Sequence, residues 1–544
     1  MQEKGEKRRV FVIGVGMTKF IKPGQATAPD YPEMSKQAIN RALRDAGIQY
    51  KEIDQVVAGY VAGDSAAGQR AVYEVGLSGV PIYNVNNNCS TGSTALYMAK
   101  KFIQGGLSEC ALAFGFEKMK KGSLGTFFND RALPLEPFMN TLNDLRGITN
   151  TPFAPQLFGA AGREHMERYG TTQEQIAKIA EKNHRHSLNN PYSQFRAGHS
   201  LQKILESKEI YYPLTKLQCC PTSDGAGAAI VCSEDFVKAH GLEDQAVEII
   251  AMSLTTDTES TFKSKSCMNI VGADMTKAAA DQCYAEAGIT PNDVQVVELH
   301  DCFAANELIT YEGLGLCGKG EAGKFIDRGD NTYGGKYVVN PSGGLIAKGH
   351  PLGATGLAQC SELVWQLRGM AEKRQVPNAK IALQHNLGLG GACVVSIYKK
   401  YNDKPGRVRA DQTSDPELLI RSETAYEETF QSVALFEKMA PLLEEHGADA
   451  VKKAQTTFGF DINKNGQTVF YTLNLKTGNG KLVRGKEGPL DVTFVLSDDT
   501  LMKLVAGKIK PQAAFLSKQV KIRGNIGQAL KFSPDLLPRH ARLQ

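Results

Sequence analysis

The sequence of 544 residues lacks several features that would assign it to a common class of protein. No apolar run approaches the roughly 18 residues that a transmembrane helix needs. The charged start, Met1 to Arg9, is not followed by the apolar region of a secretory signal. The 11 cysteines include no Cys-x-x-Cys pair, which argues against a zinc site and a disulfide framework and favours a reducing compartment. We therefore expect no transmembrane segment and no metal site.

Charge and glycine patterns exclude two further classes. The net charge of +5 is spread over mixed Lys/Glu runs without a basic block, so nucleic acid is not an expected partner. Gly14-Val15-Gly16 follows a strand-like run but lacks the third glycine of a dinucleotide fingerprint. A hydrophobic content of 42% is instead enough to fill two or three cores in a chain of this length.

Cys89 is the strongest candidate for a reactive side chain. It lies among the small polar residues 86–94, after the apolar run 80–85 and before a helix-like stretch at 95–103. A cysteine at a helix N-terminus feels the positive end of the helix dipole and nearby N–H groups, which favour the thiolate. The pattern predicts a cysteine nucleophile.

Candidate partners of Cys89 follow strand-like or glycine-rich segments far along the chain. The segment 294–303 is a predicted buried strand that ends in a polar turn, 349–356 is a glycine-rich loop, and 381–391 is a strand followed by a glycine run. These segments contain His300, Cys302, His350 and His385. The pair Cys219-Cys220 and Cys393 are predicted to pack as small buried side chains.

An internal repeat predicts a duplicated α/β fold. Residues 34–48 recur as 275–289, and both copies lead into a Gln-Val-Val strand. The pairs Thr91-Gly92 and Thr355-Gly356 also match, because a second glycine lies thirteen residues after the first in each half, at Gly105 and Gly369. Equivalent strand ends of two such halves would face each other and bring Cys89 to its partners. Residues of about 120–265 have no counterpart and are predicted to be an inserted loop domain, with a helix at 172–186, that covers the substrate site.

The C-terminal part has a different pattern. Residues 401–425 are rich in Pro, Asp, Arg and Ser and are predicted to be a linker. Helical spacing of apolar residues then precedes strands at 457–462, 469–475 and 490–496, with turns at Asn465-Gly466 and 478–480. Residues 426–544 are therefore predicted to form a small α+β domain.

Residues 8–400 resemble the thiolase superfamily in the segments 88–92, 340–344 and 349–356. The resemblance implies that Cys89 accepts an acyl group from a 3-oxoacyl-coenzyme A and that His350 activates it. Coenzyme A is then a co-substrate, and no tightly bound cofactor is expected. Typical thiolases carry Asn-Glu-Ala-Phe where this chain has His300-Asp301-Cys302-Phe303, and Cys-x-Gly where it has His385-Asn386-Leu387. The His-Asp-Cys-Phe variant resembles the thiolase part of the sterol carrier protein X family, and this resemblance implies that Cys302 is the acid/base cysteine.

Carbon–carbon cleavage beside a thioester also needs groups that stabilise an oxyanion. Backbone N–H groups near Cys89 and in the segment 387–391 are predicted to hold the oxygen of the acylating carbonyl. His350 and His300 are predicted to polarise the thioester oxygen of coenzyme A. Whether His385 takes part directly is left open.

Residues of about 430–530 resemble the sterol carrier protein type 2 lipid-binding domain, most clearly at 507–515 and 521–527. The resemblance implies an apolar tunnel for a fatty acyl chain, acyl-coenzyme A or sterol. Candidate lipid-binding residues are Phe460, Phe494, Leu501, Phe515 and Leu516. With the thiolase part, this order of domains resembles the sterol carrier protein X family along nearly the whole chain.

The expected function is a 3-oxoacyl-coenzyme A thiolase fused to a lipid or sterol carrier domain. It would cleave long or branched-chain substrates, including sterol side chains, through a cysteine acyl-enzyme. The alternatives are a condensing acyltransferase of the same superfamily and a non-enzymatic lipid-transfer protein. The family implies a homodimer through the thiolase part. Ala541-Arg542-Leu543 resembles a peroxisomal signal but is followed by Gln544, so the expected location is the peroxisome or otherwise the cytoplasm.

Overall fold

The computed structural model describes residues 7–25, 28–120, 122, 125, 128, 130–404, 430–464, 467–506, 508–509 and 511–532. The chain forms two compact units, residues 1–416 and 417–544. The predicted linker at 401–425 lies outside the described residues from 405 onward. Among the described helices, none is long and apolar enough to cross a membrane.

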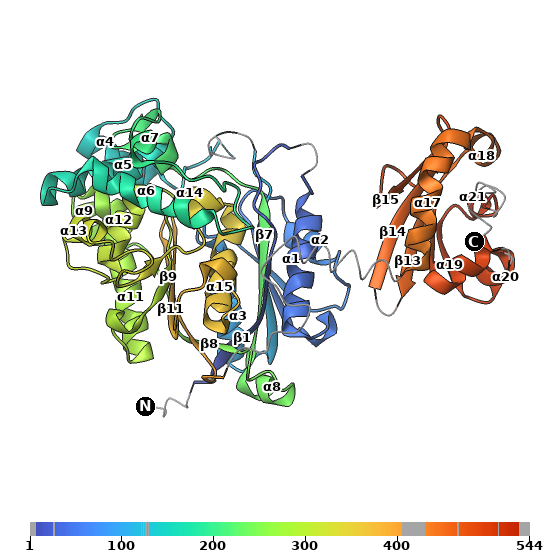
Figure 1. Ribbon diagram of the computed structural model, residues 1–544, viewed down its shortest axis with the longest axis horizontal. Helices are drawn as coiled ribbons and strands as arrows, with labels where there is room; N and C mark the ends of the chain where they lie inside the picture. The colour runs from blue at the N-terminus through green and yellow to red at the C-terminus, as the bar shows by residue number, and fades with distance from the viewer. Residues whose placement is uncertain are drawn as a thin grey trace. The chain divides into compact units, whose positions relative to one another are not determined.

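The first unit is built on a ten-stranded sheet (Figure 1). Its first five strands are β1 (Val10–Met17), β2 (Gln55–Gly59), β3 (Ile82–Val85), β4 (Cys110–Glu117) and β7 (Gly225–Ser233). Its second five are β8 (Val247–Thr255), β9 (Val296–Glu298), β10 (Val338–Val339), β11 (Ile381–Gly388) and β12 (Ala392–Lys400). The order is β10-β9-β11-β12-β8-β1-β7-β4-β2-β3, so both halves run outward from the central β8–β1 pair in the same sequence of strands. This symmetry confirms the predicted duplication.

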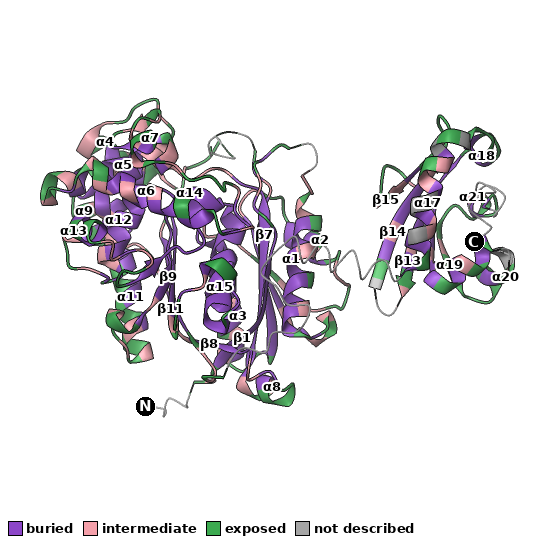
Figure 2. Cartoon of the chain, viewed as in Figure 1, coloured by how far each residue is buried: buried purple, intermediate pink, exposed green. Residues whose placement is uncertain are grey.

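The repeated helices occupy equivalent places. Helix α1 (Tyr31–Ala46) covers β1 and β7, and α11 (Ala273–Ala287) covers β8 and β12. Both end at a glycine in the left-handed region, Gly47 (φ 72°) and Gly288 (φ 67°), where other residues are strained. Helices α3 (Thr91–Gln104) and α15 (Leu352–Arg368) pack against each other and against strands of the sheet. Every residue of α15 is buried. Figure 2 shows that buried residues predominate in the central strands of the first unit.

The predicted insertion at 120–265 is too long at its C-terminal end. Strands β7 and β8 lie inside that range but belong to the central sheet, so the inserted segment between β4 and β7 spans residues 118–224. The strand β7 is Gly-Ala-Gly-Ala-Ala-Ile-Val-Cys-Ser, and every residue is buried. Its glycine and alanine content gave little strand signal, because these residues are rare in strands unless another element packs closely on them.

The inserted segment forms a helical layer beside the second half. It contains α4 (Glu136–Arg146), α5 (Phe153–Tyr169), α6 (Gln173–Ser187), α7 (Leu201–Leu205) and the hairpin β5 (Glu209–Tyr211) and β6 (Leu214–Thr215). The predicted helix at 172–186 is confirmed as α6, which Thr172 caps by accepting from the N–H of Gln175. The shorter helices of the unit are α2 (Ala67–Val72), α8 (Glu234–Ala239), α9 (Glu259–Lys263), α10 (Cys267–Ile270), α12 (Ala304–Gly313), α13 (Ala322–Asp327) and α14 (Gly344–Lys348).

The second unit is a small α+β domain, as predicted. Its sheet has the order β15-β14-β13-β16-β17 and consists of β13 (Thr456–Lys464), β14 (Gln467–Leu475), β15 (Lys481–Arg484), β16 (Val492–Ser497) and β17 (Val520–Gly524). Its helices are α17 (Gln431–His446), α18 (Ala448–Ala454), α19 (Asp498–Val505), α20 (Pro511–Leu516) and α21 (Ile526–Ala529). The predicted turn at Asn465-Gly466 lies outside the described residues.

Candidate active site and lipid cavity

Cys89 immediately precedes Ser90, the N-cap of α3. Asn88 before it has a left-handed backbone (φ 52°), and its side-chain amide donates to Leu389 O at 3.1 Å. Burial, with a smaller contribution from the charge of Glu117, raises the pKa of the Cys89 thiol to about 12. The stabilisation that a helix N-terminus gives a thiolate is therefore outweighed, and the resting side chain is a neutral thiol that needs a base.

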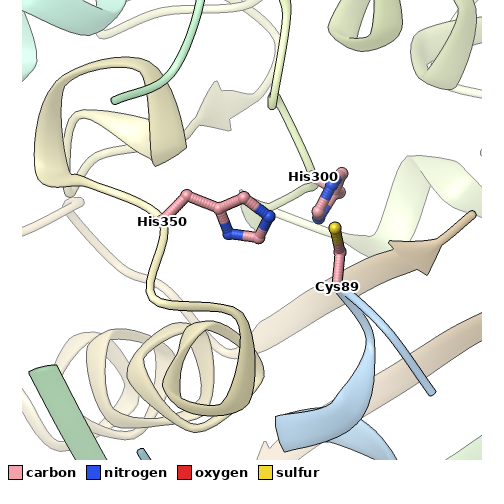
Figure 3. Close-up of side chains that lie close together, drawn as sticks. All are labelled: Cys89, His300 and His350. Atoms are coloured by element: carbon pink, nitrogen blue, oxygen red, sulfur yellow. The ribbon is translucent and has the colours of Figure 1, made fainter. Parts of the chain in front are cut away.

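Two histidines from the second half meet Cys89 (Figure 3). The sulfur of Cys89 and one ring nitrogen each of His300 and His350 all lie within 4.8 Å of one another. His300 follows β9, and His350 precedes α15. Their rings are edge to face, with centroids 5.0 Å apart. The duplicated fold thus brings together residues 211 to 261 positions distant in sequence.

The hydrogen bonds of His350 define which of its nitrogens is free. Nδ1 lies 2.7 Å from Thr355 Oγ1, and that hydroxyl donates to Pro351 O at 3.0 Å. Because the hydroxyl has one proton, it accepts from Nδ1–H and leaves the lone pair on Nε2. Nε2 is buried and has no hydrogen-bond partner among the described residues. Burial lowers the pKa of His350 to about 3, so the ring is a neutral base.

His300 and His385 have different surroundings. His300 Nδ1 lies 3.0 Å from the amide nitrogen of Asn386, and burial lowers the pKa of His300 well below its usual value. His385 Nδ1 accepts from the backbone N–H of His300 at 3.3 Å, and its Nε2 lies 3.1 Å from Thr276 Oγ1. Consecutive residues of a strand point to opposite faces, so Asn386 faces Cys89 and His385 faces away. The structure places His385 behind His300 and not among the groups around Cys89.

Cys302 lies on the same turn as His300, with Cys220 beside it. Cys220 N donates to Cys302 O at 2.9 Å, and the neighbouring residues Cys219 and Phe303 form an antiparallel bridge. Burial raises the pKa of Cys302 well above its usual value, and the nearby Cys220 and Cys89 raise it further. The sequence pattern predicted only packing for Cys220; the structure places it at the edge of the site.

A carboxylate holds the turn that carries His300 and Cys302. The side chain of Asp301 accepts from the backbone N–H groups of Leu345 (2.6 Å) and Ile346 (3.2 Å) and from the Asn183 amide (2.8 Å). A Cβ on Gly344 would lie 2.1 Å from Asp301 Oδ2, so the segment 340–344 needs glycine there. The turn is thereby fixed to the N-terminus of α14.

The end of β11 closely approaches the nucleophile loop. A Cβ on Gly388 would lie 2.1 Å from Asn87 O and 3.1 Å from Ser90 N, so only glycine fits. This contact sets the segment 387–391 beside the backbone of Cys89. The two stretches predicted to supply backbone donors for an oxyanion therefore lie side by side.

The second unit contains an apolar cavity of about 220 Å³. All five candidate lipid-binding residues line it: Phe460, Phe494, Leu501, Phe515 and Leu516. Sequence reasoning did not single out the other lining residues, which are Leu496, Leu504, Val520, Ile522, Ile526, Ala529, Leu530 and Phe532. Four of the lining side chains are exposed to solvent and form its rim, namely Phe515, Leu516, Ile526 and Leu530.

The first unit therefore has the construction of an enzyme that transfers acyl groups through a cysteine, and the second has that of a carrier for an apolar molecule. Family models agree with this division. The thiolase N-terminal domain matches residues 10–198, the thiolase C-terminal domain-like family matches 257–400, and the SCP-2 sterol transfer family matches 436–536.

Whole-length relatives identify the family. Sterol carrier protein 2 of Rattus norvegicus is 53% identical over 98% of both chains, and that of Homo sapiens is 52% identical over 99% of both. Acetyl-CoA acetyltransferase of Methanothermobacter thermautotrophicus is 35% identical over 72% of this chain and all of its own. The chain belongs to the sterol carrier protein 2 family, and its first unit is a thiolase-type acyltransferase.

Solved structures agree on the fold of the first unit. Human mitochondrial 3-ketoacyl-CoA thiolase in complex with CoA gives a TM-score of 0.54 at 20% identity, over 72% of this chain and 98% of that one. The Ltp2-ChsH2(DUF35) aldolase gives 0.62 at 22% identity, over 73% and 98%. At these identities the likeness concerns the fold alone.

Proposed function

We propose that this protein is a 3-oxoacyl-coenzyme A thiolase for long and branched acyl chains, including sterol side chains, and that Cys89 carries the acyl group. The proposal rests chiefly on one observation: a protonated Cys89 thiol lies beside a neutral His350 whose Nε2 is unpartnered. A soft nucleophile with an adjacent base is the arrangement that covalent acyl transfer needs.

In the first step, His350 Nε2 takes the proton of Cys89, and the thiolate attacks the 3-oxo carbon of the substrate. The bond between C2 and C3 then breaks, and its electron pair forms the enolate of acetyl-coenzyme A, or of propanoyl-coenzyme A from a 2-methyl substrate. The shortened acyl group stays on the sulfur of Cys89. Cys302 supplies the proton that the enolate carbon needs. The raised pKa of Cys302 suits this task, because it keeps the thiol protonated until the enolate forms.

In the second step, the Cys302 thiolate left by the first step takes the thiol proton of coenzyme A, whose sulfur attacks the thioester on Cys89. The Cys89 sulfur leaves and takes back the proton that His350 holds. The products are the acyl-coenzyme A and the free enzyme. When the enolate forms in the first step, His300 and the protonated His350 donate to the coenzyme A thioester oxygen as negative charge develops there. Backbone N–H groups near Cys89 and in 387–391 serve the acylating carbonyl in both steps. His385 has no step in this scheme, because both of its ring nitrogens are hydrogen-bonded elsewhere.

The substrate preference is supported by the second unit. Its cavity is lined by apolar side chains and has an apolar rim, which suits an acyl chain or sterol. A short, water-soluble substrate gains little from such a carrier. A tether of about 25 residues would keep the carrier at roughly millimolar effective concentration.

Assembly and location belong to the same proposal. Strand β3 ends the described ten-stranded sheet and exposes Tyr83, so a second copy has an edge to pair with. We expect a homodimer, which sedimentation measures as twice the mass of one chain. A peroxisomal location is proposed from Ala541-Arg542-Leu543, which resemble a peroxisomal signal but are followed by Gln544, with the cytoplasm as the alternative. These residues lie outside the described ones.

The test is coenzyme A-dependent cleavage of a long 2-methyl-branched 3-oxoacyl-coenzyme A and of acetoacetyl-coenzyme A. Cys89→Ala is expected to lower both rates about 10³-fold or more, since it removes the sulfur that carries the acyl group. Cys317→Ala, a half-buried cysteine outside the site, is the matched control and keeps full activity. Cleavage that survives in Cys89→Ala contradicts the proposal. A wild type without cleavage favours lipid transfer alone, and one that only condenses acyl groups favours the synthase alternative.

A further inference from the structure

One amide joins the two loops that carry Cys89 and His300. Asn386 on β11 is fully buried, and its Nδ2 lies 3.1 Å from Cys89 O and 3.0 Å from His300 Nδ1. Its Oδ1 accepts from Ser93 Oγ at 2.9 Å. Neither the thiolase scheme above nor the sequence pattern assigns Asn386 a part.

The orientation of this amide follows from its neighbours. Gln384 Nε2 lies 2.7 Å from Gly356 O, which only accepts, and 2.9 Å from Ser93 Oγ; its Oε1 accepts from Tyr398 at 2.6 Å. Gln384 therefore donates to Ser93, and the hydroxyl proton of Ser93 remains for Asn386 Oδ1. Cys89 O, which also only accepts, requires the nitrogen on the other side. Both ends of the amide are thus determined.

The orientation decides the tautomer of His300. An amide nitrogen donates, so His300 Nδ1 accepts and the proton of the neutral ring sits on Nε2. His350 has the opposite tautomer, with the proton on Nδ1 toward Thr355 and a bare Nε2. The two histidines beside Cys89 are therefore prepared for opposite tasks, one to donate and the other to accept. Because Nδ1 of His300 accepts from Asn386 and Nε2 carries the ring proton, His300 offers no free lone pair, and the cluster is also a poor zinc site.

We propose that Asn386 is a positioning residue that fixes His300 as an Nε2–H donor toward the developing oxyanion and ties it to the nucleophile loop. The inference rests on the proposed thiolase function. A donor held in place before the reaction costs no reorganisation in the transition state. A histidine free to change tautomer would present a lone pair to the oxyanion part of the time and repel it.

A double-mutant cycle between Asn386→Asp and His300→Asn tests this role. Aspartate has the same shape but only accepts, so it draws the proton to Nδ1 and removes the Nε2 donor. Asn386→Asp is expected to lower kcat for acetoacetyl-coenzyme A about 100-fold with KM within about threefold. In the His300→Asn background, the same change is expected to lower kcat less than about tenfold. This remaining loss comes from the hydrogen bond to Cys89 O, which aspartate cannot donate.

An equal loss in both backgrounds overturns the proposal, because Asn386 would then act only on the nucleophile loop or the fold. Alkylation of Cys89 by iodoacetamide at pH 9 is expected to stay within about threefold of wild type, since His350 and Thr355 are unchanged. Asn190→Asp is the matched control: it is also buried, donates to Ser342 O at 2.8 Å and lies outside the site. Any fall in kcat in this control measures the effect of a buried aspartate on the fold alone.

Ser93→Ala keeps the proposal testable if Asn386→Asp does not fold. It removes the hydroxyl that orients Asn386, and we expect a loss of about three- to tenfold that disappears in the His300→Asn background. A loss of the same size in both backgrounds contradicts the role. Cys89-dependent cleavage by the wild type is measured in the same series, so failure of the cycle is distinct from failure of the thiolase function.

Discussion

The two units bury different kinds of side chain. Around its site the thiolase unit buries ion pairs between Lys182 and Glu307 and between Lys348 and Glu298. Among the described residues of the carrier unit, Asp498 is the one buried charged side chain, and the core is largely aromatic and aliphatic. The thiolase unit also holds all 11 cysteines, the last at Cys393. The unit with the candidate active site thus buries charged side chains and thiols, and the carrier unit buries mainly apolar side chains.

The difference follows from what each task requires. Reacting atoms must be held within a few tenths of an ångström, and directional hydrogen bonds do this when every buried group is satisfied. Buried ion pairs add little net stability, but removal of one partner is costly, so they hold one geometry. An acyl chain needs unfilled apolar space instead, because contact with it is not directional. The carrier unit therefore contains an apolar cavity, whereas the site of the thiolase unit is held by a network of buried hydrogen bonds and ion pairs.

The largest expected effect concerns the reactivity of the Cys89 thiol, since all cysteines lie in the thiolase unit. Because the pKa of Cys89 is raised to about 12, its thiolate fraction grows tenfold for each pH unit throughout the accessible range. The rate of Cys89 alkylation by iodoacetamide should rise about 100-fold from pH 7 to pH 9 and show no plateau. Mass spectrometry of the labelled peptide measures it. A plateau between pH 6 and 8 would instead indicate a resting thiolate–imidazolium pair.

A smaller effect is expected when the base loses its support. Thr355→Val keeps the side-chain shape but removes the acceptor of His350 Nδ1–H. We expect kcat for acetoacetyl-coenzyme A to fall about 30-fold, because the ring no longer has one fixed tautomer. Lipid binding by the carrier unit should not change.

Thr215→Val is the control for Thr355→Val. Thr215 is also buried, and its hydroxyl donates to Ile204 O in the inserted segment. Thiolysis by this variant should match wild type. A comparable loss of kcat in both variants would show that Thr355 acts through the stability of the fold and not through His350. Thermal melting of both variants would then show a lowered melting temperature.

The smallest effect concerns the carrier. Ala529 is buried and lines the cavity, so Ala529→Leu adds three carbons to the empty space. Affinity for a long-chain fluorescent fatty acid should fall about tenfold, while stability is kept, because a void is filled rather than a packed core. Thiolysis of acetoacetyl-coenzyme A should be unchanged.

Ala448→Leu, at an exposed position away from the cavity, is the matched control and should bind the fatty acid normally. Unchanged affinity in Ala529→Leu would mean that the ligand does not use this cavity. Loss of short-substrate thiolysis in the same variant would mean that the units do not act separately.

The sequence predicted the fold well where periodic or repeated residues carry the signal. The duplicated helices and their terminal glycines Gly47 and Gly288 were visible, as were three of the five described strands of the carrier unit, β13, β14 and β16. The short strands β15 and β17 were missed. The end of the insertion was missed because β7 is rich in glycine and alanine, which admit the close approach of α15 and do not look like a strand. Gly227, for example, leaves room for Leu357.

Within the site, sequence and structure contributed different things. Local motifs placed Cys89 at a helix start, His300 and Cys302 after a strand, and His350 on a glycine-rich loop. They could do so because a nucleophile and its partners need helix starts and glycine loops, which are visible in the local sequence. The choice between His385 and Asn386 depends on which face of β11 meets Cys89, and a single strand does not reveal that. The tautomer of His350 follows from its own loop, through Thr355 and Pro351. The place of Cys220 and the tautomer of His300 were decided by the tertiary structure alone, because they depend on donors and acceptors from segments far apart in the chain.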